Sequence, residues 1–248
     1  MPHKSSHDVN EAVILCGGLG TRLREVVSDR PKALVELLGR PFLEWQLLSL
    51  AKRHRIQHAV LATGHLGEMI AQHFGSSPWC GIELSYSREA SPLGTAGGLR
   101  LAVSLTESPR ILVLNGDTYC HYDSRRLLDV HIRHAASATL WLSPTPEATR
   151  FGSVSVSQQG EVTAFSEKQA LSRPALTNAG IYLMERSLII TMQPGRVQSL
   201  EREVFPSLVG KGLFGVAGRS VLTDIGTPES LEVARTQLSA AFEGLDCQ

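Results

Sequence analysis

The chain has 248 residues, enough for one large α/β domain or two small ones with a sizeable buried core. Its 24 Lys and Arg residues balance 24 Asp and Glu residues, which argues against nucleic-acid binding, since that usually goes with a basic excess. No apolar run reaches the about 20 residues that cross a bilayer, so we expect no membrane partner.

The four cysteines show no C-x-x-C pair and no Cys/His spacing typical of a zinc site. Thiols scattered in this way suit a reducing compartment, and we therefore expect a cytoplasmic protein. The cysteines are Cys16, Cys80, Cys120 and Cys247. Residues 1–10 are polar and lack the apolar centre of a signal peptide, which predicts a flexible tail.

The first half of the chain alternates apolar runs with amphipathic ones. Buried strands are predicted at residues 12–16, 58–63, 82–86 and 111–114. Helices are predicted at residues 42–54, 67–74 and 95–105, the last with Thr95 as its N-cap. Apolar strands separated by helices favour a parallel sheet covered on both faces.

The pattern changes after Leu140. Residues 153–156 and 161–165 alternate like antiparallel strands around a turn at Gly160, and a further strand is predicted at residues 178–184. Helices are predicted at residues 199–209 and 228–238. We expect one domain over residues 11–240, with a nucleotide-binding half (11–120), a sugar-phosphate-binding half (121–240) and a tail at 241–248.

A glycine-rich loop, G-G-L-G-T-R-L at residues 17–23, directly follows the first predicted strand. Ligands of open α/β sheets bind beyond the carboxyl ends of the strands, and glycines let backbone N–H groups approach a phosphate. Arg22 and Lys32, the latter after Pro31, add two cations. The nucleotide-binding candidates here are Gly17, Gly18, Gly20, Thr21, Arg22 and Lys32.

Two common phosphate-binding motifs are absent from this loop. A dinucleotide fingerprint needs a small residue where Leu23 stands, and a Walker A loop needs a G-K-[ST] tripeptide that the chain lacks. A tight turn carrying a solvated Arg remains the alternative to phosphate binding.

Two aspartates follow predicted strands or precede helices. Asp117 ends the strand at 111–114 within N-G-D, and Asp224 opens D-I-G-T-P just before a helix. Each acid is either a metal ligand or part of a helix cap. A second glycine segment, S-P-L-G-T-A-G-G at 91–98, offers Gly94 and Thr95 for contact with a nucleotide, or else forms a loop and helix cap.

These motifs together resemble the sugar-phosphate nucleotidylyltransferase family. The run L-x-G-G-x-G-T-R-L followed by P-K is similar to the family signature, in which the loop wraps a triphosphate. The resemblance implies that Arg22 and Lys32 bind phosphates and that Asp117 and Asp224 bind Mg²⁺. It also implies an α/β fold with a Rossmann-like, three-layer, mixed and mainly parallel sheet of the nucleotide-diphospho-sugar transferase type.

The same resemblance extends to the sugar side. F-x-E-K at residues 165–168 and N-A-G-I-Y at 178–182 are similar to family segments that contact the sugar and its phosphate. It implies substrate-binding roles for Glu167, Lys168, Asn178 and Gly180. Without it, the first two are surface charges and Asn178 is the start of a strand. Cys16 stands where the family usually has alanine, either as a small core residue or as a reactive thiol.

The resemblance is greatest to the D-glycero-D-manno-heptose 1-phosphate guanylyltransferase branch, although A-L-V-E-L at residues 33–37 departs from its P-M-A-P run. The implied reaction joins a sugar 1-phosphate to a nucleoside triphosphate, with GTP and the heptose as the expected pair, by Mg²⁺-assisted in-line attack. Arg22, Lys32 and Asp117 are the expected catalytic residues. Homo-oligomer formation is left open.

Three alternatives remain. The first is a hexose 1-phosphate nucleotidylyltransferase that uses another nucleoside triphosphate. A non-catalytic nucleotide-sugar binding protein would lack a cation or a metal carboxylate, and all four are present. A sugar transferase would usually carry Asp-x-Asp where this chain has Asp117-Thr118-Tyr119. None of the nine histidines is assigned a catalytic role.

Overall fold

The computed structural model describes residues 9–18, 29–145, 153–166, 175–220 and 222–247. A seven-stranded sheet has the order β12-β8-β11-β6-β1-β4-β5, and only β11 runs antiparallel to its neighbours. The strands are β1 (Glu11–Leu15), β4 (His58–Thr63), β5 (Glu83–Arg88), β6 (Arg110–Asn115), β8 (Ala138–Thr145), β11 (Ala175–Glu185) and β12 (Leu213–Ala217). The predicted mixed, mainly parallel α/β sheet is confirmed.

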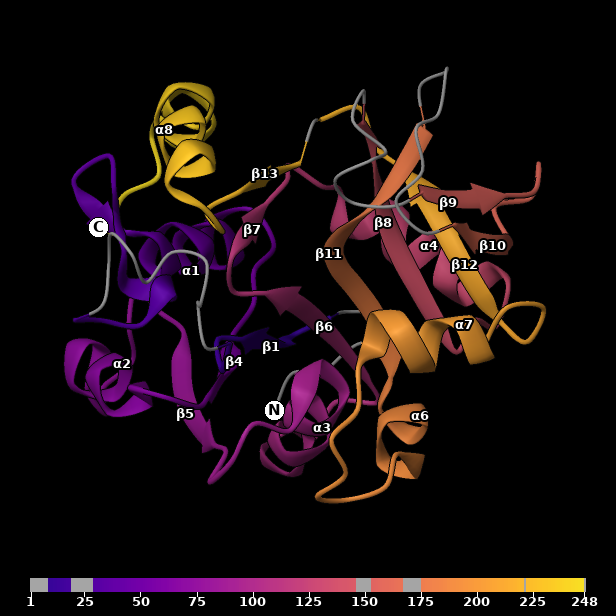
Figure 1. Cartoon of the computed structure of the whole chain (residues 1–248), viewed down its shortest axis with the longest axis horizontal. Helices are drawn as coiled ribbons and strands as arrows, with labels where there is room; N and C mark the ends of the chain where they lie inside the picture. Colours follow the sequence, from indigo (N-terminus) through magenta and orange to yellow (C-terminus); the bar gives the residue numbers. More distant parts are fainter. Residues whose placement is uncertain (1–8, 19–28, 146–152, 167–174, 221, 248) are drawn as a thin grey trace, which may run out of the picture.

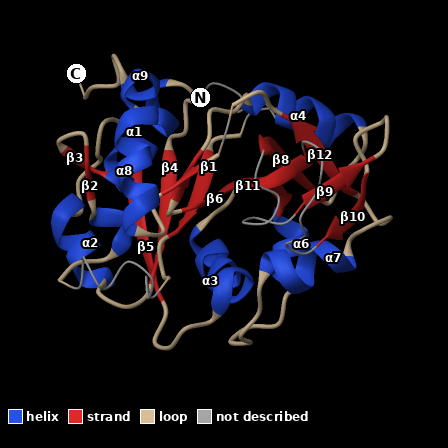
Figure 2. Cartoon of the chain, turned by 45° about the horizontal axis from the view of Figure 1, so that its top comes forward, coloured by secondary structure: helices blue, strands red, loops and turns tan. Residues whose placement is uncertain are grey.

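Helices cover both faces of the sheet, as Figure 2 shows, because successive strand residues point to opposite sides. Ala12 and Ile14 pack under one layer of helices, whereas Val13 packs under the other. The first layer contains α1 (Phe42–Lys52), α2 (Gly67–Phe74) and α4 (Ser124–Arg133). The second contains α3 (Gly94–Ala102), α6 (Arg186–Thr191), the π-helix η3 (Leu200–Val204) and α7 (Phe205–Ser207).

Short elements complete the fold (Figure 1). The 3₁₀ helices are η1 (Lys32–Leu34) and η2 (Val103–Leu105). Small ladders pair β2 (Glu36–Leu37) with β3 (Arg40–Pro41), β7 (Thr118–Tyr119) with β13 (Thr223–Asp224), and β9 (Ser153–Val156) with β10 (Val162–Ser166). The last pair is the predicted hairpin, and Gly160 in its turn has φ +85°. No helix in the described ranges is long and apolar enough to cross a membrane.

The C-terminal segment packs against the first half of the chain. Helices α8 (Pro228–Gln237) and α9 (Ser239–Phe242) cover the outer side of α1, where Phe242 stacks on Trp45 with ring centroids 4.7 Å apart. Asp246 pairs with Arg40. Residues 241–247, which belong to the tail expected from the sequence, therefore contribute to a third apolar cluster.

The roles of Thr95 and of two cysteines differ from the sequence-based expectations. Thr95 is not the N-cap of α3, which begins at Gly94; its hydroxyl donates to Glu201 and accepts from the N–H of Leu200, because the segment before η3 docks on this turn. Cys80 and Cys247, which are 167 positions apart, form a disulfide with Cα atoms 5.2 Å apart. Interpreting all four cysteines as unpaired is thus wrong for these two.

His54 makes folding sensitive to pH. Its ring stacks on Tyr122 at 4.0 Å, and burial, together with the positive charges of His121 and Arg53, lowers its pKa from 6.5 to about 4. The unfolded chain binds this proton more tightly, so the stability present above pH 6.5 is lost as pH falls towards 4. The difference corresponds to at most about 3 kcal/mol.

We expect His54→Phe, which keeps the stack, to flatten the pH dependence of the unfolding free energy between pH 7 and 4, measured by urea denaturation. His134→Phe is the matched control, since His134 also stacks on a ring, that of Phe214. An unaltered slope in His54→Phe would contradict this assignment.

Candidate active site

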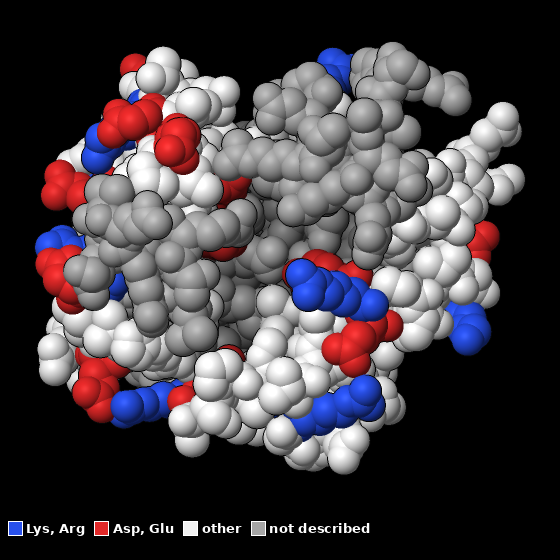
Figure 3. All heavy atoms as spheres, in the orientation of Figure 1, with Lys and Arg blue, Asp and Glu red and all other residues white. Residues whose placement is uncertain are grey.

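A cavity of about 320 Å³ lies at the carboxyl ends of the parallel strands. Figure 3 shows this face hollowed near its centre, with acidic side chains in red beside the hollow. Residues at the ends of β1, β4 and β6 form its wall, together with the loops after β1, β5 and β6 and the first residues of η1 and α3, as expected for an open α/β sheet. The lining residues are Leu15, Cys16, Gly17, Gly18, Lys32, Ala33, Ala62, Glu89, Pro92, Gly94, Thr95, Asn115, Gly116, Asp117 and Gly226.

Lys32 and Asp117 meet in this cavity. The Lys32 Nζ atom lies 2.8 Å from Asp117 Oδ2, although 85 positions separate the residues. The lysine side chain is 12% exposed and that of the aspartate 43% exposed, so the carboxylate stays accessible from the cavity. A phosphate or a metal ion entering here would meet one fixed cation and one fixed anion side by side.

The ladder between β7 and β13 brings the second predicted metal ligand to the first. Asp224 pairs with Thr118, and the N–H of Ile225 donates to the Asp117 carbonyl oxygen at 3.0 Å. Directly paired antiparallel residues have Cα atoms about 5 Å apart. The two aspartates, separated by more than a hundred positions in sequence, therefore belong to adjacent backbones at one side of the cavity.

Asp224 also has a structural role at the start of α8. Its Oδ1 atom accepts from the N–H of Gly226 at 2.6 Å and from the hydroxyl of Ser230 at 2.9 Å. Thr227 and Ser230 form the capping box of that helix. The capping alternative and the metal alternative are thus compatible, because the helix start holds the aspartate in place.

The donor set near Asp117 fits a hard divalent cation. Within the described part of the chain, no three His, Cys, Asp or Glu side chains gather closely enough to hold a metal by themselves. Magnesium commonly takes one or two protein carboxylates and fills its remaining positions with phosphate oxygens and water. Asp117 and Asp224 match that requirement, whereas a structural zinc site would need more protein ligands.

Glycines remove side chains from the inner wall. A Cβ on Gly64 would lie 2.8 Å from the Gly17 carbonyl oxygen, so the backbones after β1 and β4 touch directly. Among the described residues, no atom lies within 4 Å of a Cβ built on Gly18, so these residues leave open space beside its backbone. The other predicted members of this loop, Gly20, Thr21 and Arg22, lie outside the described residues.

Glu89 is a cavity residue that the sequence analysis did not single out. It follows β5 directly, and its Oε2 atom accepts from the N–H of Leu93 at 2.7 Å. The Oε1 atom lies 2.9 Å from a Cβ built on Gly17 and 2.5 Å from one built on Gly98, so both glycines make room for it. Burial raises the pKa of this carboxyl, and the hydrogen bond opposes that shift. The sequence feature that could have identified Glu89 is a charged residue just after the carboxyl end of a predicted strand.

Gly94 and Thr95 line the cavity at the first turn of α3. Gly94 has φ +73°, and a Cβ there would lie 2.5 Å from the Gln198 carbonyl oxygen. Glu201 accepts from the hydroxyls of Thr95 and Tyr182 at 2.7 and 3.1 Å. This carboxylate therefore ties the cavity wall to strand β11.

The predicted sugar-binding residues that are described lie on β11, next to the N-G-D loop. Asn178 donates to the Tyr182 hydroxyl and accepts from the N–H of Gly180, both at 2.9 Å, so its amide is already engaged. Neither Asn178 nor Gly180 is part of the cavity wall. Glu167 and Lys168 lie outside the described residues.

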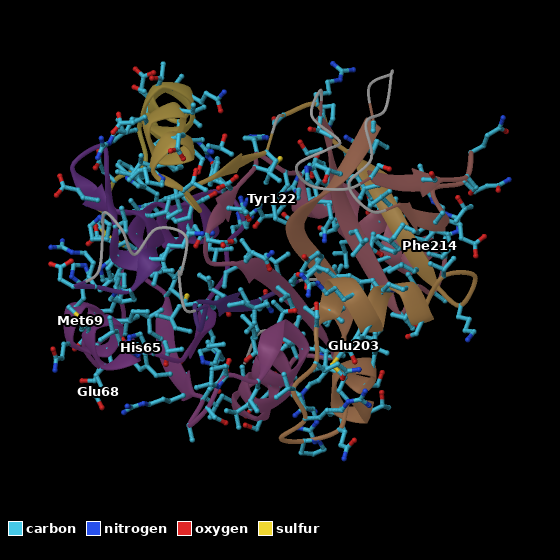
Figure 4. All side chains as sticks on the ribbon, in the orientation of Figure 1. His65, Glu68, Met69, Tyr122, Glu203 and Phe214 are labelled. Atoms are coloured by element: carbon cyan, nitrogen blue, oxygen red, sulfur yellow. A yellow bond between two sulfur atoms is a disulfide. The ribbon has the colours of Figure 1, made fainter. Side chains whose placement is uncertain are left out.

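Side chains with other reactive groups take no evident part. Burial, reinforced by the negative charge of Asp117, raises the pKa of the Cys16 thiol, which keeps it protonated and unreactive. No histidine lines the cavity among the described residues, and Figure 4 shows His65 beside α2 with Glu68 and Met69.

Comparisons with known proteins point to one family. The sequence profile described as nucleotidyl transferase matches residues 11–240. A mannose-1-phosphate guanylyltransferase of Mycobacterium tuberculosis is 36% identical over 228 residues, which are 91% of this chain; the chain spans only 63% of that relative. A D-glycero-alpha-D-manno-heptose 1-phosphate guanylyltransferase of Aneurinibacillus thermoaerophilus is 34% identical, and the match covers 92% of this chain and 98% of the relative.

A solved structure agrees with the sequence comparisons. HddC from Yersinia pseudotuberculosis, crystallised with GMP-PN, superposes with a TM-score of 0.80 at 25% identity. The superposition covers 93% of this chain and 100% of HddC.

Gly180 provides a test of how closely β11 approaches the N-G-D loop. It has φ +72°, and a Cβ there would lie 2.7 Å from Thr118 Oγ1 and 3.0 Å from Asn115 Nδ2. We expect Gly180→Ala to lower the unfolding free energy by more than the ~1–2 kcal/mol of a left-handed alanine alone. Gly195→Ala measures the cost of the left-handed conformation alone, since Gly195 has φ +71° and no atom of the described residues lies within 4 Å of a Cβ built there. Equal losses in the two variants, measured by urea denaturation, would show that the contact is unimportant.

Proposed function

Because the chain belongs to the nucleotidyl transferase family, we propose that it joins a sugar 1-phosphate to a nucleoside triphosphate, giving a nucleoside diphosphate sugar and pyrophosphate. The family predicted from the sequence motifs is confirmed by the profile match. The observation that carries the proposed reaction is the meeting of Lys32, Asp117 and the Asp224 segment at one cavity.

The reaction needs alignment of two anionic substrates and no protein nucleophile. An oxygen of the sugar 1-phosphate forms a bond to the α-phosphorus while the bond to the β-phosphate oxygen breaks, and pyrophosphate leaves. Lys32, with Arg22, binds the triphosphate, and Lys168 binds the attacking phosphate. These cations offset the repulsion between substrates and hold them in line.

Asp117 and Asp224 would hold Mg²⁺, which when bound neutralises phosphate charge and favours departure of pyrophosphate. The Lys32 ammonium, 2.8 Å from Asp117, is placed to bind phosphate beside that carboxylate. The space beside the Gly18 backbone admits the triphosphate. Glu167 holds sugar hydroxyls together with Asn178, whose amide has a second N–H and a second oxygen lone pair beyond its bonds to Tyr182 and Gly180.

We propose GTP as the nucleotide. Both guanylyltransferase relatives support this, and so does the position of Glu89. Strands β6, β1, β4 and β5 are neighbours, so three spacings of about 4.8 Å separate the end of β6 from that of β5. A nucleotide whose phosphates lie at Asp117 can extend its base towards Glu89. Guanine offers two adjacent N–H donors on its pairing edge, and one carboxylate can accept both.

We propose D-glycero-D-manno-heptose 1-phosphate as the sugar substrate. Mannose 1-phosphate is the alternative that the assay below tests. The heptose relative, 34% identical over 92% of this chain, supports the choice of the heptose, and the mannose relative, 36% identical over 91% of it, supports the alternative. Both sugars share the manno configuration. The chain is incubated with Mg²⁺ and every pair of one of four nucleoside triphosphates with one of these sugar 1-phosphates. Mass spectrometry of the products then tests the substrates and the reaction together. Absence of pyrophosphate release from every pair would refute the proposed reaction.

We expect Asp117→Asn to lower turnover by at least about 100-fold, because one preorganised electrostatic partner is commonly worth that much. Pyrophosphate release measures the rate. Asp123→Asn is the control: Asp123 caps α4 outside the cavity wall, and Asn is an equally good cap. A near-normal rate for Asp117→Asn would remove this residue from the mechanism.

Glu89→Gln should lower kcat/KM for GTP about 10- to 100-fold, since the variant exchanges a charged acceptor for a neutral amide. Rates with UTP or ATP should change far less, because these bases lack the paired donors. The control Glu83→Gln alters an exposed acid at the other end of β5, which Glu89 follows. If all triphosphates lose activity equally, Glu89 does not recognise the base.

A further inference from the structure

Gln46 is a buried amide in an otherwise mainly apolar helix face. Its side chain on α1 is 2% exposed, and most of its buried neighbours on that helix are apolar. They are Phe42, Leu43, Trp45, Leu47, Leu48 and Leu50, together with Ser49. A polar group placed here costs free energy unless its hydrogen bonds are made.

The amide of Gln46 holds the two carbonyl groups that flank the Asp117 turn. Its Nε2 atom donates to the carbonyl oxygen of Asn115 at 2.9 Å and to that of Thr118 at 3.0 Å. Gly116 and Asp117 lie between those two residues. One side chain thus closes the base of the turn from the helix side, using both of its N–H groups.

The orientation of the amide follows from its partners. Turning it over would set Oε1 against two carbonyl oxygens, so Nε2 must face them. The Oε1 atom then has no hydrogen-bond partner among the described residues. Leucine or methionine would fill this volume without burying an unpaired Oε1 atom, but would take this donor away from the carbonyl groups of Asn115 and Thr118. Packing alone therefore does not account for glutamine at this position, whereas the two bonds to the turn do.

The backbone of the turn makes further contacts within the protein, so the Asp117 side chain is the part of the turn that can bind a ligand. The N–H of Gly116 donates to the Leu15 carbonyl oxygen at 3.0 Å, and the Asp117 carbonyl oxygen accepts from Ile225. A Cβ on Gly116 would lie 2.7 Å from the Leu15 oxygen, so the turn fits tightly on β1. Contacts from β1, from α1 and from the residue after β13 together hold the backbone on both sides of Asp117, and Lys32 pairs with its carboxylate.

We propose that Gln46 is a positioning residue that sets the metal affinity of Asp117 by clamping the backbone on both sides of it. This inference rests on the proposed function, in which Asp117 is a metal ligand. Groups that orient metal ligands commonly alter metal affinity when they are replaced, and here the group acts through the main chain.

Gln46→Met keeps the length of the side chain and removes both donors. Mn²⁺, followed by electron paramagnetic resonance, is titrated into the full chain alone and then with α,β-methylene guanosine triphosphate. We expect the Kd for Mn²⁺ to rise about 10-fold or more. Binding of the nucleotide analogue in EDTA should not change, because the two hydrogen bonds of Gln46 go to Asn115 and Thr118 and not to the phosphate-binding Lys32.

Leu50→Ala is the matched control on the same helix, since Leu50 is fully buried and makes no bond to the turn. It should lower the unfolding temperature and leave the Kd for Mn²⁺ unchanged. If Gln46→Met does not fold, Gln46→Glu retains the shape of the side chain while losing at least one donor, and the same weakening is expected.

Asp117→Asn, titrated in parallel, separates this inference from the proposed function. Weak Mn²⁺ binding in Asp117→Asn with normal binding in Gln46→Met would overturn the clamp and leave the metal site in place. Normal binding in both variants would overturn both. Weakening in both, with Leu50→Ala unaffected, supports the clamp.

Discussion

The pairing of β13 with β7 is the contact on which the candidate site depends. It places Thr223 and Asp224 beside Thr118 and Tyr119, and so joins the end of the domain to the loop that follows β6. Only four residues form this ladder, so the packing of neighbouring apolar side chains contributes most of its stability. Ile225 and Tyr119 are buried in the same apolar cluster as Trp45 and Phe242, so hydrophobic burial holds two polar segments together.

Helix α1 supports the site from behind. Trp45 packs against the C-terminal helices, and Gln46 bonds to the turn that carries Asp117. The C-terminal segment in turn is tied to the first half by the disulfide between Cys80 and Cys247 and by the ion pair of Arg40 with Asp246. The same layer of packing thus fixes the position of both proposed metal ligands.

The charge of the cavity explains why such a site would require a cation. Asp117 and Glu89 line it, Asp224 lies on the strand beside Asp117, and Lys32 is the described cation. A triphosphate entering a wall with this surplus of carboxylates would be repelled. In the proposed function, Mg²⁺ at Asp117 would offset this negative charge, and the glycine backbone would add N–H dipoles without side-chain bulk. The proposed metal dependence would then follow from the charge balance of the described residues.

Local sequence patterns determined much of the fold. Alternation and turn chemistry located β4, α2, the β9–β10 hairpin and the capped start of α8, since these depend on neighbouring residues. The motifs also placed Lys32 and Asp117 among the site residues. Helix α4 and strands β8 and β12 were not predicted, and residues 199–209 form a π-helix and a short α-helix where one helix was expected.

Only the tertiary structure decided the remainder, because it depends on contacts between distant segments. The role of Thr95 follows from docking of η3, and the disulfide between Cys80 and Cys247 spans 167 positions. Glu89 becomes a candidate site residue only when the fold places it beside Gly17 and Gly98. Gln46 looks in sequence like one polar residue on an amphipathic helix. Its hydrogen bonds go to residues 69 and 72 positions away in the sequence, and they form because β6 ends under α1. A local pattern of polar and apolar residues cannot predict contacts at that sequence separation.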